Sequence, residues 1–222
     1  MDVKSLLITL EGPDGGGKTT QIRKLTQYLE ERGIPFLATR EPGGTRIGDR
    51  VRDILLDPSL SDMAPRTEMM LYAASRSQLV EQVIRPALDQ GKIVICDRFV
   101  DSSIVYQGMG SSKKYLQEAI TINQLATGGL KPQRTYVLDL PVKEGKNRLY
   151  ARGSEVDRIE GKGDSFHQKI REGFLDLARK EPERFLVVDA TQSVTEVFEI
   201  LRRDLEQQLG ERNDREKGGC GK

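Results

Sequence analysis

The feature that most constrains the fold is a glycine-rich run at residues 12–19, GPDGGGKT, which lies between two contrasting segments. The apolar segment SLLITLE precedes it and the amphipathic segment TTQIRKLTQYLEE follows it, as a strand and a helix would. The spacing matches G-x4-G-K-[ST]. Glycines let the backbone turn its N–H groups inward around an anion, and the helix N-terminus adds partial positive charge. The sequence therefore predicts a nucleoside triphosphate site on a strand–loop–helix unit.

The residues of this run have expected parts in holding ATP. Lys18 can bridge the terminal phosphates, and the Thr19 hydroxyl can ligate Mg²⁺. The run does not define the reaction, because ATPases, GTPases and small-molecule kinases share it. No asparagine begins the N-K-x-D pattern with which a GTPase reads its base, so motifs elsewhere must decide. The other expected phosphate-binding residues are Gly12, Gly15, Gly16, Gly17 and Thr20.

Short apolar runs alternate with longer amphipathic stretches along the chain. The runs are continuously apolar, which is typical of strands covered on both faces. This alternation predicts an α/β fold with a five-stranded parallel sheet flanked by helices. The expected strands cover residues 6–10, 35–39, 93–96, 135–140 and 185–188. The expected helices cover residues 19–31, 48–56, 66–89, 113–126, 142–150, 166–179 and 194–209.

Length, charge and cysteine usage limit the organisation of the protein. A chain of 222 residues predicts one domain over 1–209, and the polar segment 210–222 is expected to be a disordered tail. A formal net charge of +1 argues against holding nucleic acid by bulk charge. No apolar run is long enough to span a membrane. Two distant cysteines and an N-terminal apolar run too short for a signal peptide predict a cytoplasmic location.

Three polar motifs are placed where a ligand site would form. TREPGGTR at residues 39–46 and CDRFVDSSIVYQ at residues 96–107 each begin where an expected strand ends. YAASR at residues 72–76 lies within the expected long helix. Ligands of open parallel sheets bind at the carboxyl ends of the strands. We therefore expect all three motifs to converge near the glycine-rich run.

These motifs together resemble those of a known family. EGPDGGGKTT, TREPGGT, LYAASR, DRFVDSSIVYQG, LATGGLKP and DRIE follow in the order found in bacterial thymidylate kinases, from about residue 5 to residue 209. The resemblance implies a P-loop nucleoside monophosphate kinase. It implies transfer of the γ-phosphoryl group of ATP to dTMP, giving dTDP and ADP for dTTP synthesis, with Mg²⁺ and usually as a homodimer.

The resemblance also implies how dTMP is held. Tyr72 and Arg76 are four residues apart on a helix, so the ring could stack on a pyrimidine while the guanidinium donates to its carbonyl oxygen. Most family members have Phe at position 72, and without the resemblance a half-buried core tyrosine would be favoured. Arg98 is expected to bind the 5′-phosphate, and Arg52 is either a second phosphate ligand or a solvated helix residue. Ser103 and Gln107 resemble the residues that line the thymine and the sugar.

Three acidic residues have more than one expected role. Asp14, within the glycine-rich run, would serve Mg²⁺ or orient dTMP. Glu41 would contact the sugar or the metal, or pair with Arg40 or Arg46 in its loop. Asp97 would orient the arginine that follows it or hold the metal through water. Many bacterial members have proline at position 46, so this loop tip is expected to differ.

A polar, glycine-punctuated stretch resembles the family's mobile lid, expected at about residues 148–164. The glycine-rich run carries no arginine, so the resemblance implies that the lid brings one to the transferred phosphoryl group. Arg152 is the first choice, with Arg148 and Arg158 as alternatives. With Lys18, Arg98 and Asp14, it completes the expected catalytic set. His167 is expected to be structural, because an acceptor phosphate is already a nucleophile.

Two other functions stay open. One is a monophosphate kinase that acts on UMP, CMP or another small acceptor. The other is a P-loop switch ATPase that works by binding partners. The helices expected at residues 66–89 and 113–126 are candidates for a dimer interface, although their apolar faces could equally be core.

Overall fold

The molecule is built around one parallel sheet. The structure, a computed structural model, describes residues 5–110, 113–153 and 157–217, without the side chains of Lys113, Arg152 and residues 211–217. The strand order is β2-β3-β1-β4-β5, and all neighbouring pairs are parallel, which confirms the expected fold class. The strands are β1 (Leu6–Glu11), β2 (Phe36–Arg40), β3 (Ile93–Asp97), β4 (Arg134–Asp139) and β5 (Phe185–Asp189).

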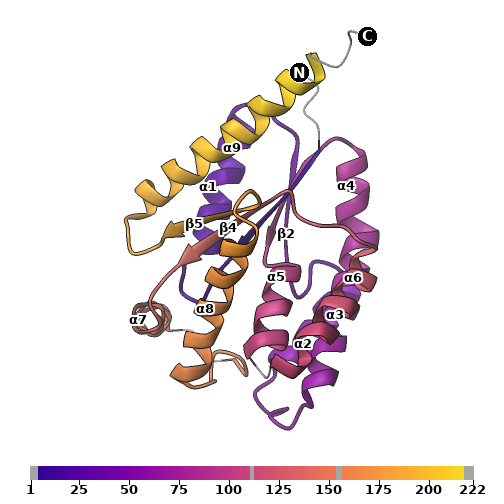
Figure 1. The fold of residues 1–222 in the computed structure, drawn as a ribbon, viewed down its shortest axis with the longest axis vertical. Coiled ribbons are helices and arrows are strands. Elements are labelled where there is room, and N and C mark those ends of the chain that lie inside the picture. The colour runs from indigo at the N-terminus through magenta and orange to yellow at the C-terminus, as the bar shows by residue number, and fades with distance from the viewer. Residues whose placement is uncertain (1–4, 111–112, 154–156, 218–222) are drawn as a thin grey trace.

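Helices connect the strands and cover both faces of the sheet (Figure 1). The first half of the chain contains α1 (Lys18–Glu31), α2 (Arg46–Leu56), α3 (Pro65–Leu79), the π-helix η1 (Val80–Ile84) and α4 (Arg85–Asp89). Next come α5 (Val100–Ser103), the π-helix η2 (Ile104–Gly110), the 3₁₀-helix η3 (Lys113–Tyr115) and α6 (Leu116–Thr127). The remaining helices are α7 (Val142–Arg152), α8 (Asp164–Lys180) and α9 (Val194–Lys217).

Alternate residues of each central strand pack on opposite faces of the sheet. Leu6 and Ile8 of β1 join a buried cluster with α1 and α9, whereas Leu7 joins a cluster with the helices from α3 to α4. A third cluster packs η2 and α8 against β4. Burial on both faces explains the continuously apolar runs in the sequence. The two-sided packing fixes the carboxyl ends of β1, β2 and β3 next to one another.

The helices differ from the expected ones in three places. The motif after β3 is helical as α5 and η2, although the sequence shows no helical period there. The expected helix 66–89 is interrupted by the π-helix η1. Helix α9 extends to Lys217, into the segment expected to be disordered, because the buried part of the helix propagates into residues such as Glu and Arg that favour helices. Residues 218–222 lie outside the described part.

Two further features bear on the expected organisation. Helix α7 continues to Arg152, so the first part of the expected lid is helical, and residues 154–156 lie outside the described chain. No helix among the described residues is long and apolar enough to cross a membrane.

Candidate active site

A single pocket brings the glycine-rich run and the three motifs together at the carboxyl edge of the sheet. Strands β3 and β2 extend the sheet on one side of β1, and β4 and β5 extend it on the other. Open parallel sheets bind ligands at such a switch point. The pocket is lined by Asp14, Gly15, Gly17, Lys18, Thr19, Thr20, Arg40, Glu41, Pro42, Arg52, Leu56, Tyr72, Arg76, Asp97, Arg98, Ser102, Ser103, Tyr106, Gln107, Leu149, Asp157, Ile159 and Glu160.

The glycine-rich run is a loop whose close packing requires glycine. Gly12 has φ +121°, and a Cβ there would lie 2.5 Å from the carbonyl oxygen of Leu138 in β4. A Cβ at Gly15 would lie 2.5 Å from the carbonyl oxygen of Gly145 in α7. A larger residue at position 15 would therefore push α7 away from the loop. This contact gives a physical reason why the loop carries no arginine there.

Lys18 is buried within the loop that it follows. Its Nζ donates to the carbonyl oxygens of Gly12 at 3.2 Å and Pro13 at 2.9 Å. Burial and the nearby Arg98 lower the pKa of Lys18 to about 8, although Asp14 and Asp97 oppose this shift. A phosphate group bound in the loop would place a negative counter-charge beside the ammonium group of Lys18.

Thr19 and Asp97 present oxygen atoms side by side at the pocket. The Thr19 hydroxyl donates to Asp97 Oδ2 at 3.2 Å. No group of three or more His, Cys, Asp or Glu residues suited to a metal occurs in the described chain. Mg²⁺ is commonly held by one or two protein oxygens, with phosphate oxygens and water filling the other positions. A hydroxyl and a carboxylate therefore fit a Mg²⁺ ion that arrives with ATP.

Arg98 joins the glycine-rich loop to the end of β3. Its guanidinium donates to the carbonyl oxygen of Gly12 at 3.0 Å, to Ser102 Oγ at 3.1 Å and to Asp14 Oδ1 at 2.5 Å. Burial opposes ionisation of Asp14, yet Arg98 and Lys18 lower its pKa to about 2. Asp14 is therefore a carboxylate at neutral pH, and it holds Arg98 at the pocket.

The backbone of Arg98 is strained, and a residue missed by the sequence reasoning holds it. Arg98 has φ +68° and is the one non-glycine residue with positive φ in the described ranges. Such a conformation costs about 1–2 kcal/mol. The fully buried Glu11 accepts hydrogen bonds from Phe99 N at 2.8 Å and from Ser102 Oγ at 2.5 Å. Burial, assisted by Asp101, raises the pKa of Glu11 to about 8.

The expected thymine side of the pocket is built around Arg76. Its buried guanidinium donates to Glu41 Oε2, with Nε at 2.8 Å, and to Ser103 Oγ at 3.0 Å. It also donates to Asn123 Oδ1. The second carboxylate oxygen of Glu41 is buried and lacks a hydrogen-bond partner among the described residues. Glu41 thus pairs with Arg76. The alternative expected from the sequence, a pair with Arg40 or Arg46 in its own loop, is not formed with Arg40, which lies 3.5 Å from Asp49.

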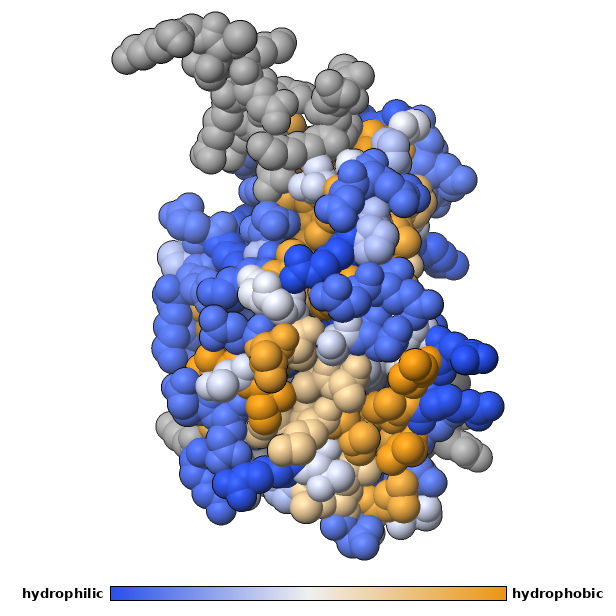
Figure 2. Space-filling model, turned by 90° about the vertical axis from the view of Figure 1, so that its right-hand side faces the viewer, coloured by the Kyte–Doolittle hydropathy of each residue, from blue (hydrophilic) through white to orange (hydrophobic). Residues whose placement is uncertain are grey.

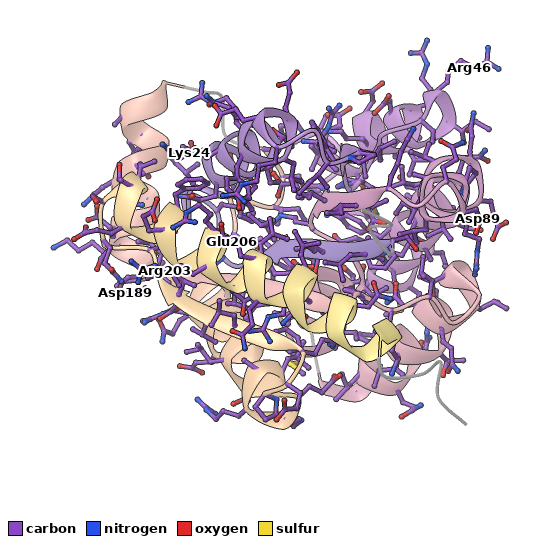
Figure 3. The ribbon with its side chains drawn as sticks, turned by 90° about the horizontal axis from the view of Figure 1, so that it is seen from above. Lys24, Arg46, Asp89, Asp189, Arg203 and Glu206 are labelled. Atoms are coloured by element: carbon purple, nitrogen blue, oxygen red, sulfur yellow. The ribbon has the colours of Figure 1, made fainter. Side chains whose placement is uncertain are left out.

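Tyr72, Arg52 and Gln107 all line the pocket, as the family resemblance implies. Tyr72 is half-buried, and burial together with the nearby Glu68 raises its pKa above the usual range. Arg52 donates to the carbonyl oxygen of Pro42 at 2.9 Å, which ties α2 to the loop after β2. Gln107 Nε2 donates to Glu68 at 2.8 Å. Arg46, by contrast, is exposed and points away from the body of the molecule (Figure 3).

The expected lid arginines are placed differently from one another. Arg148 faces Glu144 at 3.4 Å on α7, and its side chain does not line the pocket. Arg158 is buried in an ion pair with Glu68 at 2.7 Å, which removes it as a free lid cation. Arg152 ends α7, but its side chain lies outside the described part of the structure. His167 is buried near the carbonyl oxygen of Glu160, in accord with a structural role.

Comparison with known proteins identifies the family. A family model described as thymidylate kinase matches residues 10–200. A thymidylate kinase of Symbiobacterium thermophilum is 51% identical over 210 residues, covering 94% of this chain and 96% of that protein. One from Exiguobacterium sibiricum is 50% identical over 198 residues, covering 89% and 92%. The crystal structure of thymidylate kinase from Ehrlichia chaffeensis matches with a TM-score of 0.71 at 33% identity, covering 90% of this chain and 98% of that one. This chain therefore belongs to the thymidylate kinase family.

Proposed function

We propose that the protein transfers the γ-phosphoryl group of ATP to dTMP, giving dTDP and ADP. The observation that carries this function is one pocket with two chemically different parts. The glycine-rich loop and Lys18 suit a triphosphate. Tyr72, Arg76 and Gln107 suit a pyrimidine, which offers a flat ring and polar edge atoms. Family membership supports the same reaction.

Arg98 is proposed to bind the 5′-phosphate of dTMP, with Arg52 as a second ligand. Both line the pocket between the loop after β2 and the glycine-rich loop. Two guanidinium groups can fix the acceptor phosphate for in-line attack. Tyr72 stacks on thymine, and Ser103 and Gln107 line the thymine and sugar. Arg76, whose N–H groups donate to Glu41, Ser103, Asn123 and the carbonyl oxygen of Phe99, exchanges one of these partners for the carbonyl oxygen of thymine. Glu41 offers its second carboxylate oxygen, which has no hydrogen-bond partner among the described residues, to the sugar or to the metal.

The proposed mechanism needs positioning and positive charge. The acceptor phosphate is the nucleophile, so no general base is assigned. Thr19, and Asp97 directly or through water, would hold Mg²⁺, which would supply positive charge to the phosphates of ATP. Lys18 and Arg98 add fixed positive charge, and the lid arginine Arg152 completes it. The backbone of residues 12–20 holds the phosphates of ATP.

Release of ADP with different acceptors tests this function. ATP turnover should depend on dTMP and be much slower with UMP, CMP or dGMP. Equal or faster turnover with UMP or CMP would identify another monophosphate kinase. Slow hydrolysis that no acceptor stimulates would identify a P-loop switch ATPase.

A homodimer is proposed from a contiguous apolar surface on α2, α3 and α6. Figure 2 shows this surface in the lower part of the molecule. Monomeric proteins rarely leave large contiguous apolar patches exposed. Light scattering should give twice the mass of one chain, and the mass of one chain would contradict the dimer. The exposed apolar side chains of this surface are Ile47, Ile54, Met70, Ile120 and Leu125.

We also propose a cytoplasmic location for the protein.

A further inference from the structure

Glu68 connects two parts of the pocket that are far apart in the sequence. It lies in the first turn of α3 and is buried, with 4% of its surface exposed. One carboxylate oxygen, Oε1, accepts a hydrogen bond from Gln107 Nε2 on η2 at 2.8 Å. The other oxygen, Oε2, pairs with Arg158 NH1 at 2.7 Å and lies 3.8 Å from Lys162 Nζ. One carboxylate therefore serves a residue of the proposed thymine site and two cations that follow α7.

Arg158 fastens its segment to the wall of the pocket through several groups. Its backbone N–H donates to the carbonyl oxygen of Leu56 at 3.3 Å, and its Nε donates to the carbonyl oxygen of Leu55 at 2.9 Å. Both acceptors lie at the C-terminal end of α2, where carbonyl groups lack partners within the helix. The side chain is 7% exposed. Arg158 therefore bridges α2 and α3 from outside both helices.

The residues on either side of Arg158 face the pocket. Asp157, Ile159 and Glu160 line it, and Asp157 Oδ1 accepts from the N–H groups of Ile159 and Glu160 at 2.8 Å each. These bonds make residues 157–160 a compact turn. The position of Arg158 therefore sets the position of one wall of the pocket.

We propose that Glu68 is a positioning residue that seats the 157–160 turn over bound dTMP while holding Gln107 against the base. It has no contact with the reacting atoms. Through Arg158 it closes one side of the acceptor site, and through Gln107 it senses whether that site is filled. Binding of dTMP and seating of the turn are then coupled through one buried carboxylate. This role rests on the proposed dTMP kinase function.

The variant Glu68→Gln isolates the ionic contact. The amide oxygen can still accept from Gln107, but the group facing Arg158 becomes neutral. A buried arginine without its counter-charge is costly, so the turn should leave its seat. We expect the KM for dTMP to rise at least about fivefold while the KM for ATP stays within about twofold. A purely structural defect would not separate the two substrates in this way. Glu81→Gln, which removes the exposed partner of Arg85 beyond α3, is the matched control and should behave as wild type.

Arg158→Gln tests the same contact from the other side. It should raise the KM for dTMP as Glu68→Gln does. Because both changes remove the same contact, the KM for dTMP of the double variant should be no higher than that of the more impaired single variant. Hydrogen exchange reports seating without catalysis. In the wild type, dTMP should slow exchange of the amides of Ile159 and Glu160, and in both single variants this protection should be lost. If Glu68→Gln does not fold, Arg158→Gln decides by the same two readouts.

The outcomes separate this inference from the function on which it rests. Wild-type protein without dTMP-dependent turnover would overturn the kinase function itself. An active wild type, with either variant retaining both its KM for dTMP and its dTMP-dependent protection, would overturn the role of Glu68 alone. Additive effects in the double variant would also contradict it.

Discussion

At the scale of single residues, the site depends on acidic side chains that hold Arg98 in a fixed place. Asp14 holds the guanidinium of Arg98, and Glu11 holds the backbone that follows it. Ser102 links the two, because its hydroxyl donates to Glu11 and accepts from Arg98. Fixed positive charge of this kind needs no reorganisation when the phosphoryl group moves.

Arg98→Gly removes the proposed phosphate ligand with little backbone strain, since glycine readily adopts φ +68°. Loss of a charge-assisted contact to the phosphate should raise the KM for dTMP about 30-fold or more. Inhibition by thymidine, which has no phosphate, should change little. Comparing the two ligands is the measurement, and an equal loss for both would indicate damage to the whole pocket instead.

Glu11 should make stability depend on pH. Its pKa is raised to about 8 in the folded protein from the usual 4.5, first by burial and then by Asp101. The folded state therefore binds a proton more tightly than the unfolded state, and the resulting stability is lost as pH rises from about 5 through 8. Urea unfolding across this range should show wild type losing stability relative to Glu11→Gln as pH rises, because glutamine stays uncharged. Parallel curves would contradict the raised pKa.

Glu11 also shows why part of the site could not be predicted from the sequence. It ends an apolar strand, and its partner Phe99 is 88 residues away along the chain. No local pattern marks a carboxylate whose role comes only from such a contact. Lys18, Arg98 and Tyr72, by contrast, stand within local motifs, and each lines the pocket.

At the scale of elements, the helix after β3 is the main feature that the sequence did not predict. Residues 100–110 lack a helical apolar period, because several of them are held by buried polar contacts instead. Asp101, for example, pairs with Arg184 near the start of β5 at 2.6 Å. The ends of the strands were predicted to within one residue, because burial on both faces makes each strand continuously apolar.

Helix α7 and the glycine-rich loop pack closely enough that a methyl group should separate them. A Cβ on Gly145 would lie 2.7 Å from the carbonyl oxygen of Asp14. Gly145→Ala should therefore shift α7 and lower kcat/KM for ATP about tenfold or more. Steady-state kinetics with ATP varied at saturating dTMP measure this. Gly163→Ala is the control, because a Cβ there meets no atom within 4 Å, and the two variants behaving alike would contradict the packing argument.

Fewer arginines remain as candidates for the lid residue that contacts the transferred phosphoryl group. Arg158 is buried against Glu68, and Arg148 faces Glu144, so Arg152 remains the proposed ligand of the transferred phosphoryl group. Arg152→Ala should lower kcat at least about tenfold with little change in dTMP affinity. Single-turnover kinetics with a dTMP binding measurement give both values, and an unchanged kcat would remove Arg152 from the mechanism.

At the scale of the whole molecule, a net charge of +1 conceals a strongly segregated distribution. Lys18, Arg52, Arg76 and Arg98 all line one pocket that is proposed to hold two phosphorylated ligands. Carboxylates near the pocket offset part of this positive charge, so the net charge of the chain gives no sign of the cluster. The sequence could predict which motifs converge, because ligands of open parallel sheets bind at the carboxyl ends of the strands, where two of the motifs begin. It could not predict which carboxylate pairs with which arginine, since those pairs form only when distant segments meet.

Transfer of label from [γ-³²P]ATP to dTMP tests the proposed reaction at its core. With wild-type protein and Mg²⁺, radioactivity should appear in a product that co-migrates with dTDP, in amounts equal to the ADP formed. Label released only as inorganic phosphate, at a rate that dTMP does not change, would contradict phosphoryl transfer between the two nucleotides.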